Sequence, residues 1–197
     1  MSVDKPNLLT GRPVTTLQKL STRFRFLLAV PAVAALLYLV DRGPIWPGAL
    51  VIAFGEFVQL WASAHLHKNV DMVTSGPYSW LRNPMYLGRG FVGLGWVLMT
   101  WRWYLIIAYV LGYACYAQAR VVGEEKRLGG LFGEDYARYC AAVNRWLPWP
   151  RRKLSAARWS WEAVQRNHQL RVTLGMAALI ALVWWRVRSP ETFGLGR

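Results

Sequence analysis

The stretch GPYSWLRNPMY, from Gly76 to Tyr86, contains a polar loop and then the start of a helix, directly before a new apolar segment. Asn83 can cap the first free amides of a helix, and Pro84 at the first helical position loses no needed hydrogen bond. The predicted helix runs to about Thr100, turns at Trp101 to Trp103, and returns from Tyr104 to Gln118 as an antiparallel neighbour. The sequence therefore predicts a helical hairpin.

Further apolar segments lie on both sides of this hairpin, and 54% of the 197 residues are hydrophobic. The run from Phe24 to Val40 is apolar apart from Arg25, and as a helix it would measure about 26 Å, enough for a thin bilayer core. A signal peptide is the competing interpretation, but no small-residue cleavage site follows this run. A second segment opens at Trp46 and extends to about His65, and Val172 to Trp185 is either a short further span or a re-entrant helix.

The charge distribution favours a membrane over a nucleic acid as the partner. The formal net charge is +14, with 5 basic residues before Phe26 and 11 between Arg120 and Arg171. If both basic blocks face the cytoplasm, the positive-inside rule is satisfied by an even number of spans between them. We expect an all-α, polytopic membrane helical bundle of about five transmembrane helices, with the N-terminus and the polar segments on the cytoplasmic side. Nucleic-acid binding is a minor alternative.

Ionisable residues inside the spans are costly and are therefore candidate functional groups. Glu56 interrupts the second span, where it serves chemistry directly or pairs with Arg89 or another interior partner. His65 and His67 lie two residues apart but have no third ligand nearby in the sequence, so we predict no metal site.

A second polar stretch follows the hairpin. The last hairpin helix should continue past Ala119 and carry Glu124 and Glu125 one to two turns beyond the hydrocarbon edge. Gly129 and Gly130 permit a bend, and a short helix is predicted from Glu134 to Val143. The remaining residues, 151–197, are predicted to form an interfacial helix from Leu154 and a probable extra span.

Together the two polar stretches resemble the isoprenylcysteine carboxyl methyltransferase family and its relatives, the phospholipid N-methyltransferases, over about residues 65–150. The first family motif is Gly-Pro-Tyr followed by Arg-His-Pro-x-Tyr-x-Gly, matched here by Gly76, Pro77, Tyr78, Arg82, Pro84, Tyr86 and Gly88. Asn83 stands where the stricter pattern has His, and a neutral amide cannot shuttle a proton near pH 7. The second motif is matched by Glu124, Glu125, Phe132, Gly133, Tyr136, Tyr139, Arg145, Leu147 and Pro148.

The resemblance implies a single integral-membrane methyltransferase domain over residues 1–197. It further implies S-adenosylmethionine as the donor, held at the cytoplasmic ends of the spans, and a lipophilic acceptor that enters from the bilayer. Glu124 or Glu125 suits the donor's ammonium or ribose hydroxyls, and Arg82 with the helix-start amides suits its carboxylate. The candidate cofactor-binding residues are Tyr78, Arg82, Asn83, Pro84, Tyr86, Gly88, Glu124, Glu125, Tyr136 and Tyr139.

Methyl transfer depends mainly on placing the two reactants in line. A carboxylate acceptor would be oriented by Arg145 or Arg89, whereas an amine or a phenol needs a base, for which Glu56 is the candidate. The sequence leaves the acceptor open among isoprenoids, fatty acids, phospholipid amines and other lipophilic molecules. The alternative function is a non-catalytic membrane scaffold or transport subunit that retains the fold.

Overall fold

The computed structural model describes residues 34–35, 37–40, 43–66, 72–148 and 159–189, and the regular structure among them is helical. The chain divides into two units, Met1–Leu39 and Val40–Arg197. Residues 34–35 and 37–39 of the first unit are helical, and most of the span predicted for Phe24 to Val40 lies outside the described residues.

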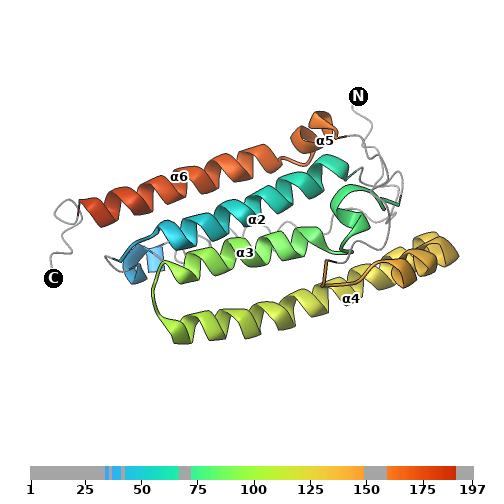
Figure 1. The fold of residues 1–197 in the computed structure, drawn as a ribbon, viewed down its shortest axis with the longest axis horizontal. Helices are drawn as coiled ribbons and strands as arrows, with labels where there is room; N and C mark the ends of the chain where they lie inside the picture. The colour runs from blue at the N-terminus through green and yellow to red at the C-terminus, as the bar shows by residue number, and fades with distance from the viewer. Residues whose placement is uncertain (1–33, 36, 41–42, 67–71, 149–158, 190–197) are drawn as a thin grey trace, which may run out of the picture. The chain divides into compact units, whose positions relative to one another are not determined.

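The second unit is built from antiparallel helices. They are α2 (Trp46–His65), the 3₁₀ helix η1 (Gly76–Ser79), α3 (Pro84–Leu98), α4 (Trp103–Ala142), α5 (Trp161–Arg166) and α6 (Gln169–Arg188). Figure 1 shows α2 between α6 and α3, with α4 on the other side of α3 and α5 beside the end of α2. We call the end of this bundle that carries η1 and α5 the motif end.

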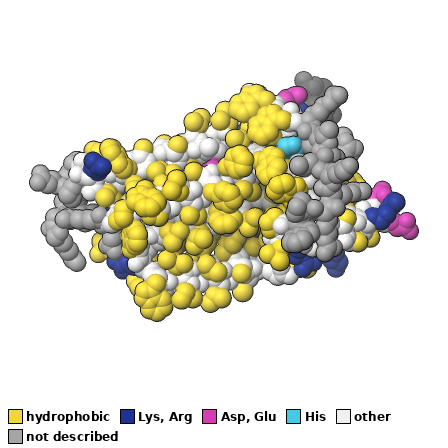
Figure 2. All heavy atoms as spheres, in the orientation of Figure 1, with side chains coloured by type: hydrophobic (Ala, Val, Ile, Leu, Met, Phe, Trp, Pro, Cys, Tyr) yellow, Lys and Arg dark blue, Asp and Glu magenta, His cyan; other side chains and the backbone are white. Residues whose placement is uncertain are grey.

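Three described helices, α2, α4 and α6, are long and apolar enough to cross a membrane. Figure 2 shows hydrophobic side chains over the middle of one face, with charged side chains mainly towards its two ends. The all-helical class is thus confirmed with three candidate membrane spans, while five spans remain a prediction because α3 has 15 residues and the first run is largely undescribed.

Helix α6 contains the segment predicted from Val172 to Trp185 but is longer, with 20 residues from Gln169 to Arg188. The apolar run gave too short a length for α6, because polar residues on both sides of the run are also helical. The short helix predicted for Glu134 to Val143 is confirmed as the part of α4 that follows the non-helical residue Gly133. Helix α4 continues to Ala142.

The bend in α4 was predicted at the wrong glycines. It lies at Gly133, where φ is 50° and ψ is −122°, and not at Gly129 and Gly130. A positive φ favours glycine, which has no β-carbon to collide with the backbone. The start predicted for the interfacial helix at Leu154 falls outside the described residues, and the described helix α5 begins at Trp161.

Helix α3 contacts its two neighbours in different ways. Against α2, a β-carbon on Gly95 would lie 2.5 Å from the Gly48 carbonyl oxygen, and one on Gly55 would lie 2.6 Å from the Gly88 carbonyl oxygen. Small residues of this kind allow membrane helices to approach backbone to backbone. The side of α3 that faces α4 instead contacts the rings of Tyr109 and Tyr113.

Candidate functional site

Hydrogen bonds join the two polar stretches at the motif end. The Tyr139 hydroxyl on α4 donates a hydrogen bond to the Tyr78 carbonyl oxygen at 2.7 Å, and the Arg82 amide donates one to the Asn144 carbonyl oxygen at 2.9 Å. Inside the first stretch, the Ser79 hydroxyl donates to the Gly76 carbonyl oxygen over 2.7 Å. Segments some sixty residues apart in sequence are therefore held as one structure.

Glu125 lies between two arginines. Its Oε1 accepts from Arg145 Nε at 3.2 Å, its Oε2 accepts from Arg145 Nη2 at 2.6 Å, and Arg82 Nη1 lies 3.5 Å from Oε1. The Glu125 side chain is 12% exposed and that of Arg82 is 14% exposed. The fork of two bonds fixes the orientation of both partners, and the hydrogen bond with Glu125 raises the pKa of the Arg145 guanidinium.

One hydrogen-bond donor of Arg82 has no partner among the described residues. Its Nε atom is buried, and within the described part of the chain it has no hydrogen-bond partner. A buried donor without a partner is costly, so a ligand that supplies an acceptor there is favoured.

Glu124 occupies a more open position beside Glu125. It accepts a hydrogen bond from the Tyr86 hydroxyl at 3.3 Å and lies 3.8 Å from Arg127, and its side chain is 42% exposed. The Arg89 guanidinium carbon lies 5.5 Å from the centre of the Tyr86 ring, within range of a cation–π contact. We call Arg82, Tyr86, Glu124, Glu125 and Arg145 the arginine–glutamate cluster.

Asn83 does not cap α3 through its side chain. Its Nδ2 atom donates to the Arg145 carbonyl oxygen at 3.4 Å, while its own carbonyl oxygen accepts from the amides of Tyr86 and Leu87. Pro84 begins the helix as predicted. The side-chain cap was therefore the wrong expectation for Asn83, because the amide reaches the loop after α4 instead.

The remaining predicted cofactor residues lie in different environments. Tyr136 packs against Tyr139 with ring centres 6.1 Å apart, close to the first stretch. Burial, with a smaller effect from the charge of Glu124, raises the pKa of the Tyr78 hydroxyl, so this phenol stays neutral. Gly88 faces α2, where an added β-carbon would meet Gln59 and Gly55.

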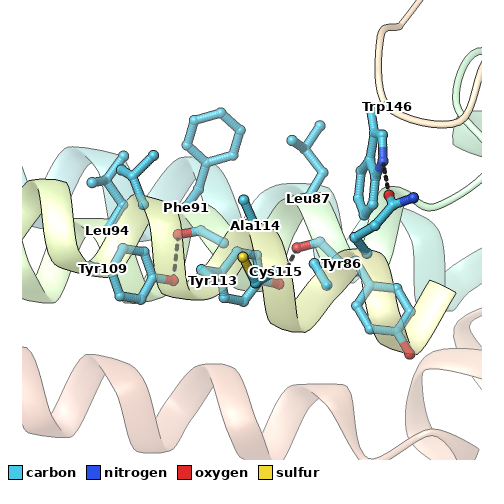
Figure 3. A pocket seen from close by; sticks show the side chains of 13 residues that line it. Tyr86, Leu87, Phe91, Leu94, Tyr109, Tyr113, Ala114, Cys115 and Trp146 are labelled. Carbon is cyan, nitrogen blue, oxygen red and sulfur yellow. Dashed lines mark hydrogen bonds between the residues drawn. The ribbon is translucent and has the colours of Figure 1, made fainter.

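A cavity of about 620 Å³ lies between α3 and α4 and ends at the cluster. Its lining is apolar and aromatic and comprises Tyr86, Leu87, Gly90, Phe91, Leu94, Tyr109, Val110, Tyr113, Ala114, Cys115, Ala117, Gln118 and Trp146. We call it the α3–α4 groove. Figure 3 shows Leu87, Phe91, Leu94 and Trp146 on one side of the helix pair, and Tyr86 belongs to both the groove and the cluster.

Tyrosines space the two helices that form this groove. The Tyr109 hydroxyl donates to the Gly90 carbonyl oxygen at 3.0 Å, and the Tyr113 hydroxyl donates to the Tyr86 carbonyl oxygen at 2.5 Å (Figure 3). Their stacked rings lie over Gly93 and Gly90 respectively. Sequence reasoning did not assign these residues, although two tyrosines four apart opposite glycines are the signal that would have indicated the contact.

Trp146 also lines the groove, although the sequence predicted no role for it there. Its indole nitrogen donates to Gln118 Oε1 at 3.0 Å, and it follows Arg145 directly in the chain. The groove and the arginine–glutamate cluster therefore share a boundary.

Glu56 lies away from the cluster, between α2 and α6. Its Oε2 accepts from the Thr173 hydroxyl at 2.5 Å and from Gln169 Nε2 at 3.2 Å, and its Oε1 accepts from Gln59 Nε2 at 3.4 Å. The carboxylate thus has interior partners, but they are neutral groups and not Arg89. The structure brings Arg145 into the cluster, Arg89 beside Tyr86, and Glu56 to a different helix contact.

Comparison with known proteins shows which family these elements are similar to. The phospholipid methyltransferase family model matches residues 45–135, which include α2, η1, α3 and most of α4. The protein-S-isoprenylcysteine O-methyltransferase of Xenopus laevis is 28% identical over 113 residues, which cover 51% of this chain and 39% of that protein.

Two further relatives carry other names. The cobalt-zinc-cadmium resistance protein CzcN of Cupriavidus metallidurans is 31% identical over 130 residues, covering 61% of this chain and 57% of that protein. The steroid 5-alpha-reductase DET2 of Solanum lycopersicum is 30% identical over 107 residues, covering 51% of this chain and 41% of that protein. The chain thus spans between 39% and 57% of the length of these relatives. Over residues 45–135, which include the first polar stretch and the Glu124–Glu125 pair of the second, the chain is similar to the phospholipid methyltransferase family.

Proposed function

We propose that this protein transfers a methyl group from S-adenosylmethionine to a lipophilic acceptor drawn from the membrane. The observation that carries the proposal is the shared boundary of a charged cluster and an apolar groove, through Tyr86 and the Arg145–Trp146 pair. Methyl transfer between a polar donor and an apolar acceptor needs a site where a polar surface and an apolar surface meet. The similarity to the phospholipid methyltransferase family over residues 45–135 and the name of the Xenopus relative support the reaction class.

The donor fits the arginine–glutamate cluster chemically. Arg82 offers a buried Nε donor to a carboxylate, and the more exposed Glu124 offers acceptor capacity to an ammonium group or to ribose hydroxyls. Glu125 holds Arg82 and Arg145 in place, and the aromatic rings of Tyr86 and Tyr136 suit an adenine or a sulfonium. When bound, S-adenosylmethionine supplies a methyl group activated on its sulfonium.

The acceptor's apolar part fits the α3–α4 groove, whose lining runs along α3 from Leu87 to Leu94. Seven residues of helix measure about 10 Å, roughly a third of a bilayer core of about 30 Å. The acceptor's reacting group would then lie near Tyr86 and Trp146, with Arg145 beside them. Since no Asp, Glu, His or Lys is among the described residues that line the groove, an acceptor that needs no deprotonation, such as a carboxylate, suits it best.

The arrangement also favours one orientation of the protein in the membrane. With the cluster on the cytoplasmic side, both the soluble donor and the basic blocks of the sequence face the cytoplasm, as the positive-inside rule favours. The acceptor would reach the groove sideways from the bilayer.

The test measures donor binding by full-length protein in lipid nanodiscs. We expect S-adenosylmethionine to bind, and Arg82→Ala to weaken binding about 10-fold or more, because a hydrogen bond to a charged group contributes about 1.5–3 kcal/mol. Arg138→Ala is the matched control, since this arginine is 77% exposed and pairs with Asp135. Absence of binding by folded wild-type protein refutes the proposal. Mass spectrometry of membranes incubated with labelled donor then identifies the acceptor.

A non-catalytic accessory role is the second candidate, favoured by the resistance-protein name of the Cupriavidus relative. This role predicts that Glu124→Gln leaves the protein's biological function intact in cells. An enzyme loses function in this variant, whose fold should be little affected because the Glu124 side chain is 42% exposed.

A further inference from the structure

The end of α2 supports the first polar stretch through one histidine ring. His65 is 6% exposed, and its Nδ1 lies 2.9 Å from the Trp61 carbonyl oxygen. Gly76 sits directly over this ring, since an added β-carbon would lie 2.6 Å from His65 Cδ2. Gly76 also has a φ of +58°, so both the space and the backbone at this point require glycine.

A segment outside the family-matched region also contacts His65. Trp159 contacts the ring edge to face, with centres 6.3 Å apart. The neighbouring Ser160 amide donates to the Ala64 carbonyl oxygen at 3.2 Å. The family match ends at residue 135, so this contact comes from a part of the chain that the family model does not describe.

Asn167 completes the attachment. Its Nδ2 donates to the carbonyl oxygens of Ser63 at 3.1 Å and Leu66 at 3.3 Å, at the end of α2. The last carbonyls of a helix lack partners within the helix, so this side chain satisfies groups that would otherwise need water. Residues 159–167 thereby form a brace on the end of α2 that also contacts His65.

We propose that this brace, through Trp159 and Asn167 as positioning residues, holds His65 beneath Gly76 and so sets the place of Tyr78 and Arg82 at the donor site. The chain of contacts runs from Trp159 to His65, from His65 to Gly76, and then along η1 to the backbone bonds with Tyr139 and Asn144. Its functional consequence for donor binding rests on the proposed function.

The first test reads the position of the loop and needs no activity. Amide hydrogen exchange over residues 76–82 is compared between wild-type and variant full-length protein in nanodiscs. Within this segment the amides of Trp80, Leu81 and Arg82 donate hydrogen bonds. We expect Trp159→Ala to speed this exchange about three- to tenfold, in line with the loss of one aromatic pair, and Trp159→Phe to restore it.

Trp161→Ala is the matched control, because Trp161 lies two residues away and is 48% exposed against 51% for Trp159. It should leave the exchange of residues 76–82 unchanged. Equal exchange in Trp159→Ala and wild type overturns the proposal, and so does a rise spread evenly over α3 and α4, which indicates general loosening.

The second test reads donor affinity. Trp159→Ala and Asn167→Asp should raise the Kd and KM for S-adenosylmethionine about three- to tenfold, with kcat at saturating donor within about twofold of wild type. A fall in kcat with an unchanged KM overturns the positioning role, since it reports a smaller folded fraction. If wild type binds no donor, the proposed function fails, while the exchange experiment still decides whether the brace exists.

Discussion

Replacing Glu125 with glutamine tests whether the arginine–glutamate cluster holds the motif end together. The carboxylate accepts two hydrogen bonds from Arg145 and faces Arg82, and its side chain is 12% exposed. Glu125→Gln keeps the size of the side chain and removes its charge. Two guanidinium groups are then left close together without an anion between them.

The expected loss follows from burial and geometry. A hydrogen bond to a charged group contributes about 1.5–3 kcal/mol, and breaking a fully buried pair costs about 3–5 kcal/mol. The Arg145 side chain is 35% exposed, so water screens part of this interaction. We therefore expect a loss of about 2–3 kcal/mol in the free energy of unfolding, or a fall in Tm of about 4–12 °C.

The assay is thermal unfolding of wild-type and variant protein in the same detergent, with Glu124→Gln as control. Glu124 is 42% exposed and its ion pair with Arg127 is open to solvent, so the control should lose less than about 1 kcal/mol. Equal Tm values for Glu125→Gln and wild type, or an equal fall in both variants, would refute the reasoning.

Three further perturbations have expected outcomes in the same unfolding assay. Gly95→Leu forces a side chain against the backbone of α2 and should cost about 1–3 kcal/mol or more, whereas Gly112→Ala, with open space around it, should gain about 0.5–1 kcal/mol. Thr173→Val removes a donor to the buried Glu56 carboxylate and should cost about 1–3 kcal/mol; an unchanged Tm contradicts this. The raised pKa of Tyr78 favours its neutral form in the fold, so stability should be constant from about pH 7 to 9 and fall above the unfolded pKa of about 10. Tyr78→Phe should reduce that alkaline loss, and an identical pH profile argues against it.

The sequence predicted the hairpin well because its signals are local. Pro84 marks the start of α3, and the turn at Trp101 falls where predicted. The bend in α4 was misplaced because Gly129 and Gly130 permit a bend without requiring one, whereas Gly133 adopts a positive φ. A permissive residue does not reveal the conformation that tertiary contacts select.

The candidate site was predicted in part for a similar reason. The motif spacing identified Arg82, Glu125 and Arg145 as separate candidates. Their mutual geometry depends on the hydrogen bond between Arg82 and the loop at Asn144, which is far from Arg82 in the sequence. Glu56 illustrates the opposite case. Its partners Thr173 and Gln169 lie more than a hundred residues later, and no local pattern connects them to it.

The contrast between the two sides of α3 has a mechanical consequence. The contact with α2 brings backbone against backbone at Gly48 and Gly55, and side chains such as Ile52 pack tightly beside it, so there is little room for α2 and α3 to shift. The spacing to α4 depends on the rings of Tyr109 and Tyr113, which can rotate and release their hydrogen bonds. We therefore expect α2 and α3 to keep their spacing, and α4 to be the helix that shifts when a bulkier molecule has to be admitted.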